Sequence, residues 1–424
     1  MNQRLPSTDA PTHRPRRRQG RLKARITAHL YQVDFGRGSE WAYYPGTDLL
    51  DLGTDRTCVW DPVANQWWIR PFGGVLGYVI VAVGSSVGVS DPQKYKVIPV
   101  YPTVFGPISA DGPEVAQYTA VLDVAPNGAF MVAAIDTATI GVFLWQGGSF
   151  ATTPVDTVTV AQAFDISISP DSSTVALALS GSPYLQAYPV SVSGFGSPYS
   201  DPGTLPSGAG HGVDWHPSGE AVGLAWEDAA AMTLAVWAWA AGWGSKYADP
   251  ASSFVGSSSA VHFSPDGAFV FVGRVDPGDS ADGQYRIYEF DLGSGIGARI
   301  AASGAPIAGP IDGVDQSDFN GSLLALGSSL QYGFITYTFD GATIGDGVTN
   351  YFPADEFDYA WHLKFSNDGQ YLIAAAPTAG TNPPFDVGRV TVFSVGAGGA
   401  LTQIGTTYVD DADGDWPYLG WRDP

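Results

Sequence analysis

The stretch AVHFSPDGAFVFVG, residues 260–273, decides the fold of this chain. Two runs of alternating apolar residues flank the tetrapeptide Ser264-Pro265-Asp266-Gly267. A turn of this composition between two such runs predicts an antiparallel β-hairpin. A single hairpin would say little about the architecture, so the number of copies in the chain determines what the hairpin builds.

Five further stretches of the chain repeat the pattern of an alternating strand, a polar turn and a second apolar strand. Each copy is followed by a third apolar run, such as IGVFLW at 140–145. The copies are VLDVAPNGAFMVAA (121–134), FDISISPDSSTVALAL (164–179), VDWHPSGEAVGLAW (213–226), SDFNGSLLALG (317–327) and LKFSNDGQYLIAAA (363–376).

The copies recur with a regular period. Their turns reach Gly128, Ser172, Gly219, Gly267, Gly321 and Gly369, at intervals of 44, 47, 48, 54 and 48 residues. A second marker keeps the same spacing, because GFGSPYSDP (194–202) and GWGSKYADP (242–250) also lie 48 residues apart. A period of about 40–50 residues with three or four strands per unit predicts the blades of a β-propeller.

Blade packing explains why such a repeat folds only as a ring. A small twisted sheet with two apolar faces buries both of them only against neighbouring sheets, and radial repetition leaves only short edges. We therefore expect one apolar residue of each innermost strand, at an equivalent position, to pack between blades. These residues are Val124, Ile168, Trp215, Phe263 and Phe365.

The two ends of the repeat region predict a seventh blade. The segment WPYLGWRDP (416–424) resembles an innermost strand that reaches its turn, whereas VLGYVIVAVGS (75–85) and YKVIPVYPTV (95–104) have the pattern of second and third strands. The sequence therefore predicts an all-β propeller, most simply of seven blades with about four antiparallel strands each. Its last blade would be closed by strands from the N- and C-terminal regions.

Composition agrees with this fold class and divides the chain. Charged residues make up 15% and the chain holds 53 Gly and 31 Pro, which disfavours long helices. The apolar run at 73–89 is too short and too rich in Gly and Ser for a membrane span. We expect a basic arm at 1–40, a Trp-rich connector with a hairpin at 41–71, and the propeller at 72–424.

The first residues of the chain carry a charge opposite to that of the rest. Residues 1–28 contain eight Lys or Arg and one Asp, although the whole chain has a net charge of −22. Such an arm suits an acidic protein surface or nucleic acid, or it is a solvated tail. We favour protein docking, because the anionic body opposes approach to nucleic acid. The expected docking residues are Arg14, Arg16, Arg17, Arg18, Arg21, Lys23 and Arg25.

Two levels of family resemblance follow from the repeats. The FSPDG turn with a later VWAW or IYEFD strand resembles the WD40-like and lactonase-like propeller superfamily over roughly residues 72–424. The GFGSPYSDP element followed by LPSGAGHGVDWHPSG resembles repeats of propeller proteins encoded by tailed bacteriophages, which are usually virion components. The Gly-His and Trp-Asp signatures of true WD40 repeats are missing, and no lactonase metal constellation maps onto these residues.

Polar residues five positions before each turn are the first candidates for chemistry, because they approach the central channel of a propeller. A metal or acid/base site formed by Asp123, Asp214 and His262 is one interpretation. The plainer interpretation is solvation in the channel or hydrogen bonding between blades. The full set is Asp123, Ser167, Asp214, His262, Gln316 and Lys364.

Other candidate sites are weaker. In DDADGDW (410–416), the alternation of Asp411, Asp413 and Asp415 suits a calcium loop, but no distant Glu completes the pattern, so a solvated acidic loop is favoured. Cys58 is the single cysteine. We find no nucleophile elbow, P-loop or dinucleotide fingerprint, and we therefore expect no nucleophilic triad, no metal and no cofactor.

These observations favour a non-enzymatic structural or adaptor protein. The resemblance implies a bacteriophage virion component that docks through its arm to other virion or scaffold proteins and presents the propeller loops to a host surface. Two alternatives stay open: a propeller enzyme of the lactonase or glycan-lyase kind with its site at the channel mouth, and an interaction scaffold in the host cytoplasm.

Overall fold

The structure is a computed structural model that forms two compact units, Met1–Leu76 with Pro99–Pro107 and Gly77–Ile98 with Ile108–Pro424. Among the residues it describes, there is no helix long and apolar enough to cross a membrane. The described residues are 42–43, 49–51, 56–61, 66–71, 77–84, 93–101, 104–105, 114–115, 121–227, 234–250, 258–274, 285–302, 317–327, 333–350, 362–377, 387–410 and 415–422.

The smaller unit contains a four-stranded sheet in the order β1-β2-β3-β4. Its strands β3 and β4 form the hairpin expected in the Trp-rich segment, with Trp60 opposite Trp67 in the register. The bounds are β1 (Ala42–Tyr43), β2 (Leu49–Asp51), β3 (Arg56–Asp61) and β4 (Gln66–Pro71).

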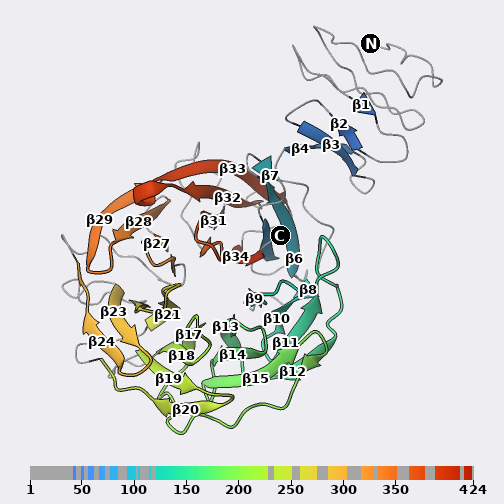
Figure 1. Cartoon of the computed structure of the whole chain (residues 1–424). Helices are drawn as coiled ribbons and strands as arrows, with labels where there is room; N and C mark the ends of the chain where they lie inside the picture. The colour runs from blue at the N-terminus through green and yellow to red at the C-terminus, as the bar shows by residue number, and fades with distance from the viewer. Residues whose placement is uncertain are drawn as a thin grey trace, which may run out of the picture. The chain divides into compact units, whose positions relative to one another are not determined.

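The larger unit contains all of the propeller that the repeats predict except the end of one strand, β6, and the short strand β7. Its sheets are arranged around a common axis, with β9, β13, β17 and β21 innermost and β12, β20 and β24 at the rim (Figure 1). In the part of the chain that the structure describes, seven sheets form this ring. The all-β, seven-bladed prediction is confirmed.

The first three complete blades in chain order have the simple order of a meander, each strand pairing with the next. Their strands are β9 (Leu122–Val124), β10 (Phe130–Asp136), β11 (Thr139–Leu144), β12 (Asp156–Thr159); β13 (Ala163–Ile168), β14 (Thr174–Leu179), β15 (Leu185–Ser191), β16 (Gly194–Phe195); and β17 (Gly210–Trp215), β18 (Ala221–Trp226), β19 (Leu234–Trp239), β20 (Trp243–Lys246).

The next three blades continue the series, and the second of them gains β25 (Ala301–Ala302), which pairs with β29 in parallel. A short 3-10 helix, η1 (Ala397–Gly399), precedes the last strand of the third. The strands are β21 (Ser258–Phe263), β22 (Phe269–Arg274), β23 (Tyr285–Asp291), β24 (Gly295–Arg299); β26 (Ser317–Phe319), β27 (Leu323–Gly327), β28 (Phe334–Phe339), β29 (Thr343–Asn350); and β30 (His362–Phe365), β31 (Tyr371–Pro377), β32 (Val387–Val395), β33 (Leu401–Asp410).

The remaining blade joins distant parts of the chain. Its innermost strand β34 (Asp415–Arg422) pairs with β5 (Gly77–Gly84), with Trp421 opposite Val79. β5 is followed by β6 (Gln93–Tyr101) and β7 (Val104–Phe105), and β8 (Glu114–Val115) also pairs with β6. The predicted closure of the ring by strands from both ends of the repeat region is confirmed.

The hydrophobic core lies between blades rather than within them. Phe263 is 6% exposed, and its cluster joins Ala221 and Val236 of one blade to Val270 and Phe290 of the next. Phe365 likewise joins Leu323 and Phe334 to Leu372. Val124, Ile168 and Trp215 occupy the same place at three other junctions, as expected for residues that cover the flanks of adjacent sheets.

Local hydrogen bonds explain why two of the hairpins turn at the Ser-x-Asp-Gly stretches 264–267 and 366–369. The hydroxyl of Ser264 donates to Asp266 at 2.6 Å, and Ser366 bonds Asp368 at the same distance. The following glycine takes the left-handed conformation, with φ of 73° at Gly267. Side-chain hydrogen bonds of this kind favour turns over continued strands, and glycine enters the left-handed region without a steric cost.

Candidate functional site

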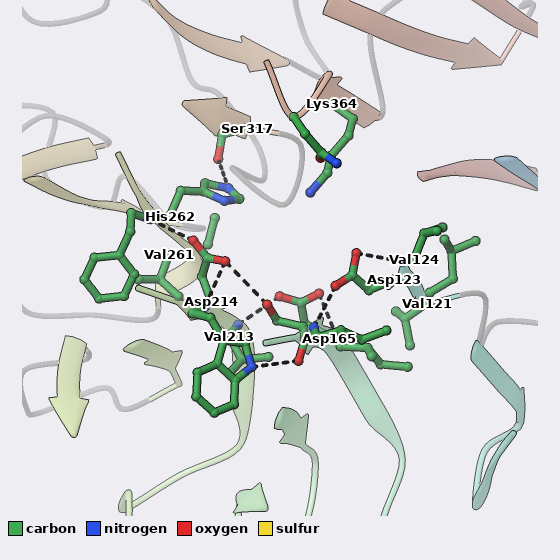
Figure 2. Close-up of a pocket in the computed structure, with 18 of the residues that line it drawn as sticks. Val121, Asp123, Val124, Asp165, Val213, Asp214, Val261, His262, Ser317 and Lys364 are labelled. Atoms are coloured by element: carbon green, nitrogen blue, oxygen red, sulfur yellow. Dashed lines mark hydrogen bonds between the residues drawn. The ribbon is translucent and has the colours of Figure 1, made fainter. Parts of the chain in front are cut away.

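A cavity of about 560 Å³ opens where the innermost strands of six consecutive blades meet (Figure 2). It therefore lies in the central channel. Figure 2 shows polar side chains from β9, β13, β17, β21, β26 and β30 around one common space. Those that the structure brings together at its wall include Asp123, Asp165, Asp214, His262, Ser317 and Lys364.

Four aspartates of the innermost strands connect neighbouring blades in the same way. Asp214 accepts the N–H of Trp215 at 3.0 Å through one oxygen and the N–H of Phe263, in the next blade, at 2.8 Å through the other. Equivalent pairs of bonds run from Asp123 to Ile168, from Asp165 to Val213 and from Asp318 to Phe365, at 2.7, 2.8 and 2.7 Å. We call these four residues the bridging aspartates.

The bridging aspartates correct one sequence-based assignment. The residue five positions before the turn at Gly321 is Gln316, and this count therefore assigns Gln316 to the channel. Gln316 lies outside the described residues. Strand pairing places Asp318, opposite Ala325, at the position that Asp214 holds opposite Gly223. The count failed because the turn after β26 is two residues shorter than the others, with Phe319 followed directly by Asn320 and Gly321.

Lys364 occupies in β30 the strand position that Asp214 occupies in β17. It carries the positive charge of this site. It is the one Lys or Arg among the described residues that line the cavity. Burial alone would lower the pKa of Lys364, but the carboxylates of the four bridging aspartates together raise it above its usual value. The ammonium group therefore stays charged, and its charge is compensated by carboxylates.

Two of the bridging aspartates titrate near neutrality. Burial raises the pKa of Asp165 to about 7, although the N–H groups of Val213 and Ile166 act in the opposite direction. Burial raises the pKa of Asp214 to about 7 as well, against the N–H of Phe263. The pKa of Asp123 is also raised by burial. Carboxyl groups poised in this way serve as proton donors or acceptors at neutral pH.

Ser317, His262 and Asp318 form a linked group across two blades. The Ser317 hydroxyl lies 3.4 Å from Nε2 of His262, and the other ring nitrogen, Nδ1, lies 3.8 Å from Oδ1 of Asp318. Burial lowers the pKa of His262, an effect that the Asp318 carboxylate opposes and Lys364 reinforces. The imidazole is therefore neutral at pH 7 and has a hydroxyl at one nitrogen and a carboxylate near the other.

Two further histidines line the cavity. Burial, reinforced by the charge of Lys364, lowers the pKa of His362 to about 3. His211 stacks on Phe164 with a ring separation of 4.9 Å, and its Nε2 lies 3.5 Å from Glu227. Phe164 and His211 thus form a stacked aromatic pair at the cavity wall.

Several candidates from the sequence lie outside this site. Within the described ranges, no group of three or more His, Cys, Asp or Glu has the arrangement of a metal site. Asp411 and Asp413 lie outside the described residues, and only the backbone of Asp415 is described, as the start of β34. The arm residues Arg14, Arg16, Arg17, Arg18, Arg21, Lys23 and Arg25 lie outside them too, so docking through the arm stays a prediction.

Sequence reasoning missed Asp165, Asp318 and Ser317. A signal for the aspartates is present, because LDV, FDI, VDW and SDF each place Asp between an apolar or small residue and an apolar residue within an innermost strand. No comparable signal marks Ser317, whose contact with His262 joins residues 55 positions apart. The expectation of no nucleophilic triad rested on local motifs, which cannot report a contact between such distant residues, and it stays a prediction.

Comparison with known proteins adds the fold relationship. No family model and no curated protein matches the sequence. Two solved structures from Bacteroides uniformis and Bacteroides fragilis, each provisionally described as a 6-phosphogluconolactonase, share 14% and 13% sequence identity with TM-scores of 0.57 and 0.56. Both matches cover 81% of this chain and 99% or 98% of the other.

These similarities bear on two expectations. They agree with the lactonase-like propeller superfamily at the level of fold, whereas the bacteriophage resemblance finds no support in either structure. Both similar structures are described as enzymes, and this finding overturns the expectation that the chain is non-enzymatic. The virion assignment and the virion or cytoplasmic location remain untested predictions of the sequence.

Proposed function

We propose that the protein is a hydrolase that opens a lactone ring in the channel cavity. The observation that carries this proposal is the group of Ser317, neutral His262 and Asp318 beside the Lys364 ammonium. A serine at one imidazole nitrogen and a carboxylate at the other is the arrangement of acyl-transfer enzymes, which is recognised by geometry rather than by sequence order. The lactonase-like fold supports the same reaction class.

In the proposed reaction, His262 takes the proton of the Ser317 hydroxyl through Nε2 while Oγ attacks the lactone carbonyl. The carbonyl oxygen becomes an oxyanion, which the Lys364 ammonium stabilises. The ring C–O bond then breaks, and the departing oxygen takes the proton from His262. Water repeats the sequence on the resulting ester, so lactone and water give a hydroxy acid and the free serine.

Asp318 and the other bridging aspartates have supporting roles in this reaction. The Asp318 carboxylate, held by the N–H groups of Phe319 and Phe365, stabilises the imidazolium that forms on His262. The hydroxy acid product carries a new carboxylate next to several others. Repulsion between these like charges favours product release.

The test is the hydrolysis of a panel of sugar and aliphatic lactones by the purified full chain. The rate is measured from the protons that hydrolysis releases. We expect turnover by the native protein and a loss of about 10³-fold or more in kcat for Ser317→Ala and His262→Gln. Ser322→Ala, in an exposed turn of the same blade, is the matched control and should retain full activity. Absence of turnover on every lactone would refute the proposed function.

A further inference from the structure

The charges of the cavity restrict the ligand it can hold. Asp123, Asp165 and Asp214 line it, and Asp318 lies directly behind His262. Against these four carboxyl groups stands Lys364, since the described lining residues include no arginine. His262 and His362 add no positive charge at neutral pH, because burial lowers the pKa of both.

A phosphate dianion would find one positive charge, Lys364, among the described residues that line the cavity. The carboxylates of all four bridging aspartates already act on Lys364. The backbone N–H groups of Ile168, Val213 and Phe263, which face the channel side of the blades, already donate to aspartates. Moving a phosphate group from water into such surroundings is unfavourable, because a buried anion needs cationic or N–H partners.

An uncharged ring with several hydroxyl groups fits the cavity better, because the aspartates offer hydrogen-bond acceptors to hydroxyl donors. Each bridging aspartate accepts one N–H bond on each oxygen, and an ionised carboxylate has about four acceptor positions. On Asp123, Asp165 and Asp214, which line the cavity, the remaining positions are available to ligand hydroxyls, except for the one on Asp214 that accepts the Ser167 hydroxyl at 3.4 Å. The stacked rings of Phe164 and His211 offer a flat surface against which the apolar face of a sugar ring packs.

We propose that the channel cavity binds an uncharged, hydroxyl-rich sugar ring and excludes the phosphorylated form of the same ring. This inference names the substrate class of the proposed lactone hydrolysis. It depends on the proposed function only in assuming that the natural ligand carries a lactone group. It also separates the chain from the phosphorylated substrate named for the two structures that share its fold.

The test is calorimetric binding of two unreactive rings, 1,5-anhydroglucitol and its 6-phosphate, to the full chain at pH 8, above the pKa of about 7 to which burial raises Asp165 and Asp214. We expect the uncharged ring to bind at least about tenfold more tightly, since like-charge contacts in a binding site cost a few kcal/mol. Equal or tighter binding of the phosphate form would overturn the inference. Failure of both rings to bind at millimolar concentration would overturn it too.

Charge-neutralising variants identify the source of the discrimination. Asp214→Asn should improve binding of the phosphate form by about threefold to tenfold and change binding of the uncharged ring far less. Asp346→Asn, on the exposed part of β29, removes the same charge away from the cavity and should change neither. Equal effects of the two variants would assign the discrimination to net charge and overturn the role of the cavity.

Salt provides a second measurement that needs no variant. Higher ionic strength should weaken the repulsion of the phosphate form and leave the uncharged ring unaffected. These outcomes are independent of catalysis, because neither ring has a carbonyl to attack. A protein that binds the uncharged ring but leaves every lactone intact would lose the proposed function and keep this inference.

Discussion

At the scale of single residues, the tight turns of the propeller depend on positions that only certain residues can occupy. Gly267 adopts φ of 73°, and its carbonyl oxygen lies 3.1 Å from Nε2 of the buried His216 in the preceding blade. A Cβ atom on Gly267 would collide with that imidazole ring. The turn glycine therefore has two functions, since it permits the left-handed backbone and leaves space for a contact between blades.

Gly267→Ala should lower the free energy of unfolding by about 2–4 kcal/mol. The left-handed conformation costs a residue with a Cβ about 1–2 kcal/mol, and the displaced His216 ring adds the cost of an overpacked contact. Urea unfolding measures the change. Gly147→Ala is the matched control, because Gly147 has φ of 76° and nothing within 4 Å of its Cβ position. It should lose about 1–2 kcal/mol, and equal losses in both variants would contradict the role of His216.

At the scale of elements, each innermost strand is joined to the next blade by backbone donors and a side-chain acceptor. The bridging aspartates satisfy N–H groups at strand edges that no neighbouring strand pairs. Their carboxyl groups consequently lie between blades, where burial opposes ionisation. The same side chains thus contribute both to the cohesion of the ring and to the chemistry of the channel.

The raised pKa of Asp165 predicts a dependence of stability on pH. Between its usual value of 3.8 and about 7, the folded protein keeps a proton that the unfolded chain releases. The stability contributed by this proton is fully present below pH 3.8 and is lost as the pH rises through 7. His362 acts in the opposite direction. Below pH 6.5 its imidazole binds a proton in the unfolded chain, whereas in the folded protein it stays neutral until about pH 3, so stability falls as the pH falls through this range.

Comparison with Asp165→Asn isolates the carboxyl contribution. From pH 8 to pH 5, the wild-type protein should gain free energy of unfolding relative to the variant, and this gain should begin near pH 7 and continue to grow down to pH 5. Chemical denaturation at several pH values measures this difference. Parallel stability curves for the two proteins would show that Asp165 titrates at its usual pKa.

The strand pattern and the turns were predictable because both are local. Alternation and the Ser-Pro-Asp-Gly turn specify each hairpin, and the 48-residue spacing specifies their repetition. The short turn at Asn320-Gly321 shifted the expected channel residue to Gln316, since only strand pairing reveals that Asp318 is the equivalent residue. The group of Ser317 and His262 could not be predicted, because it depends on the angle between two blades rather than on any local pattern.

At the scale of the whole molecule, the ring is completed by β34 and β5. Arg422 at the end of β34 donates from Nε to the carbonyl of Gly128 at 2.8 Å. Its guanidinium also lies 4.1 Å from the ring centroid of Trp145 and 5.4 Å from that of Tyr78. This one side chain therefore ties the closing blade to the blade that follows it around the ring.

Arg422→Ala should lower the free energy of unfolding by about 1–3 kcal/mol, from the loss of a charged hydrogen bond and a cation–π contact. Deletion of 415–424 should have a much larger effect, because it removes the innermost strand of one blade. Thermal unfolding measures both. Lys246→Ala, which removes an ion pair with Asp249 at the surface, is the control and should cost under about 1 kcal/mol. A truncated chain that melts like the parent would contradict closure by β34.

The pairing of β34 with β5 connects segments more than three hundred residues apart in the chain. Bringing such distant segments together carries a large loop-closure entropy, and contacts of this kind slow folding. During synthesis, β5 emerges early and waits without its partner while the later blades assemble. We therefore expect the pairing of β34 with β5 to form late in folding, and until then the edge of β5 stays open to chaperones or to aggregation.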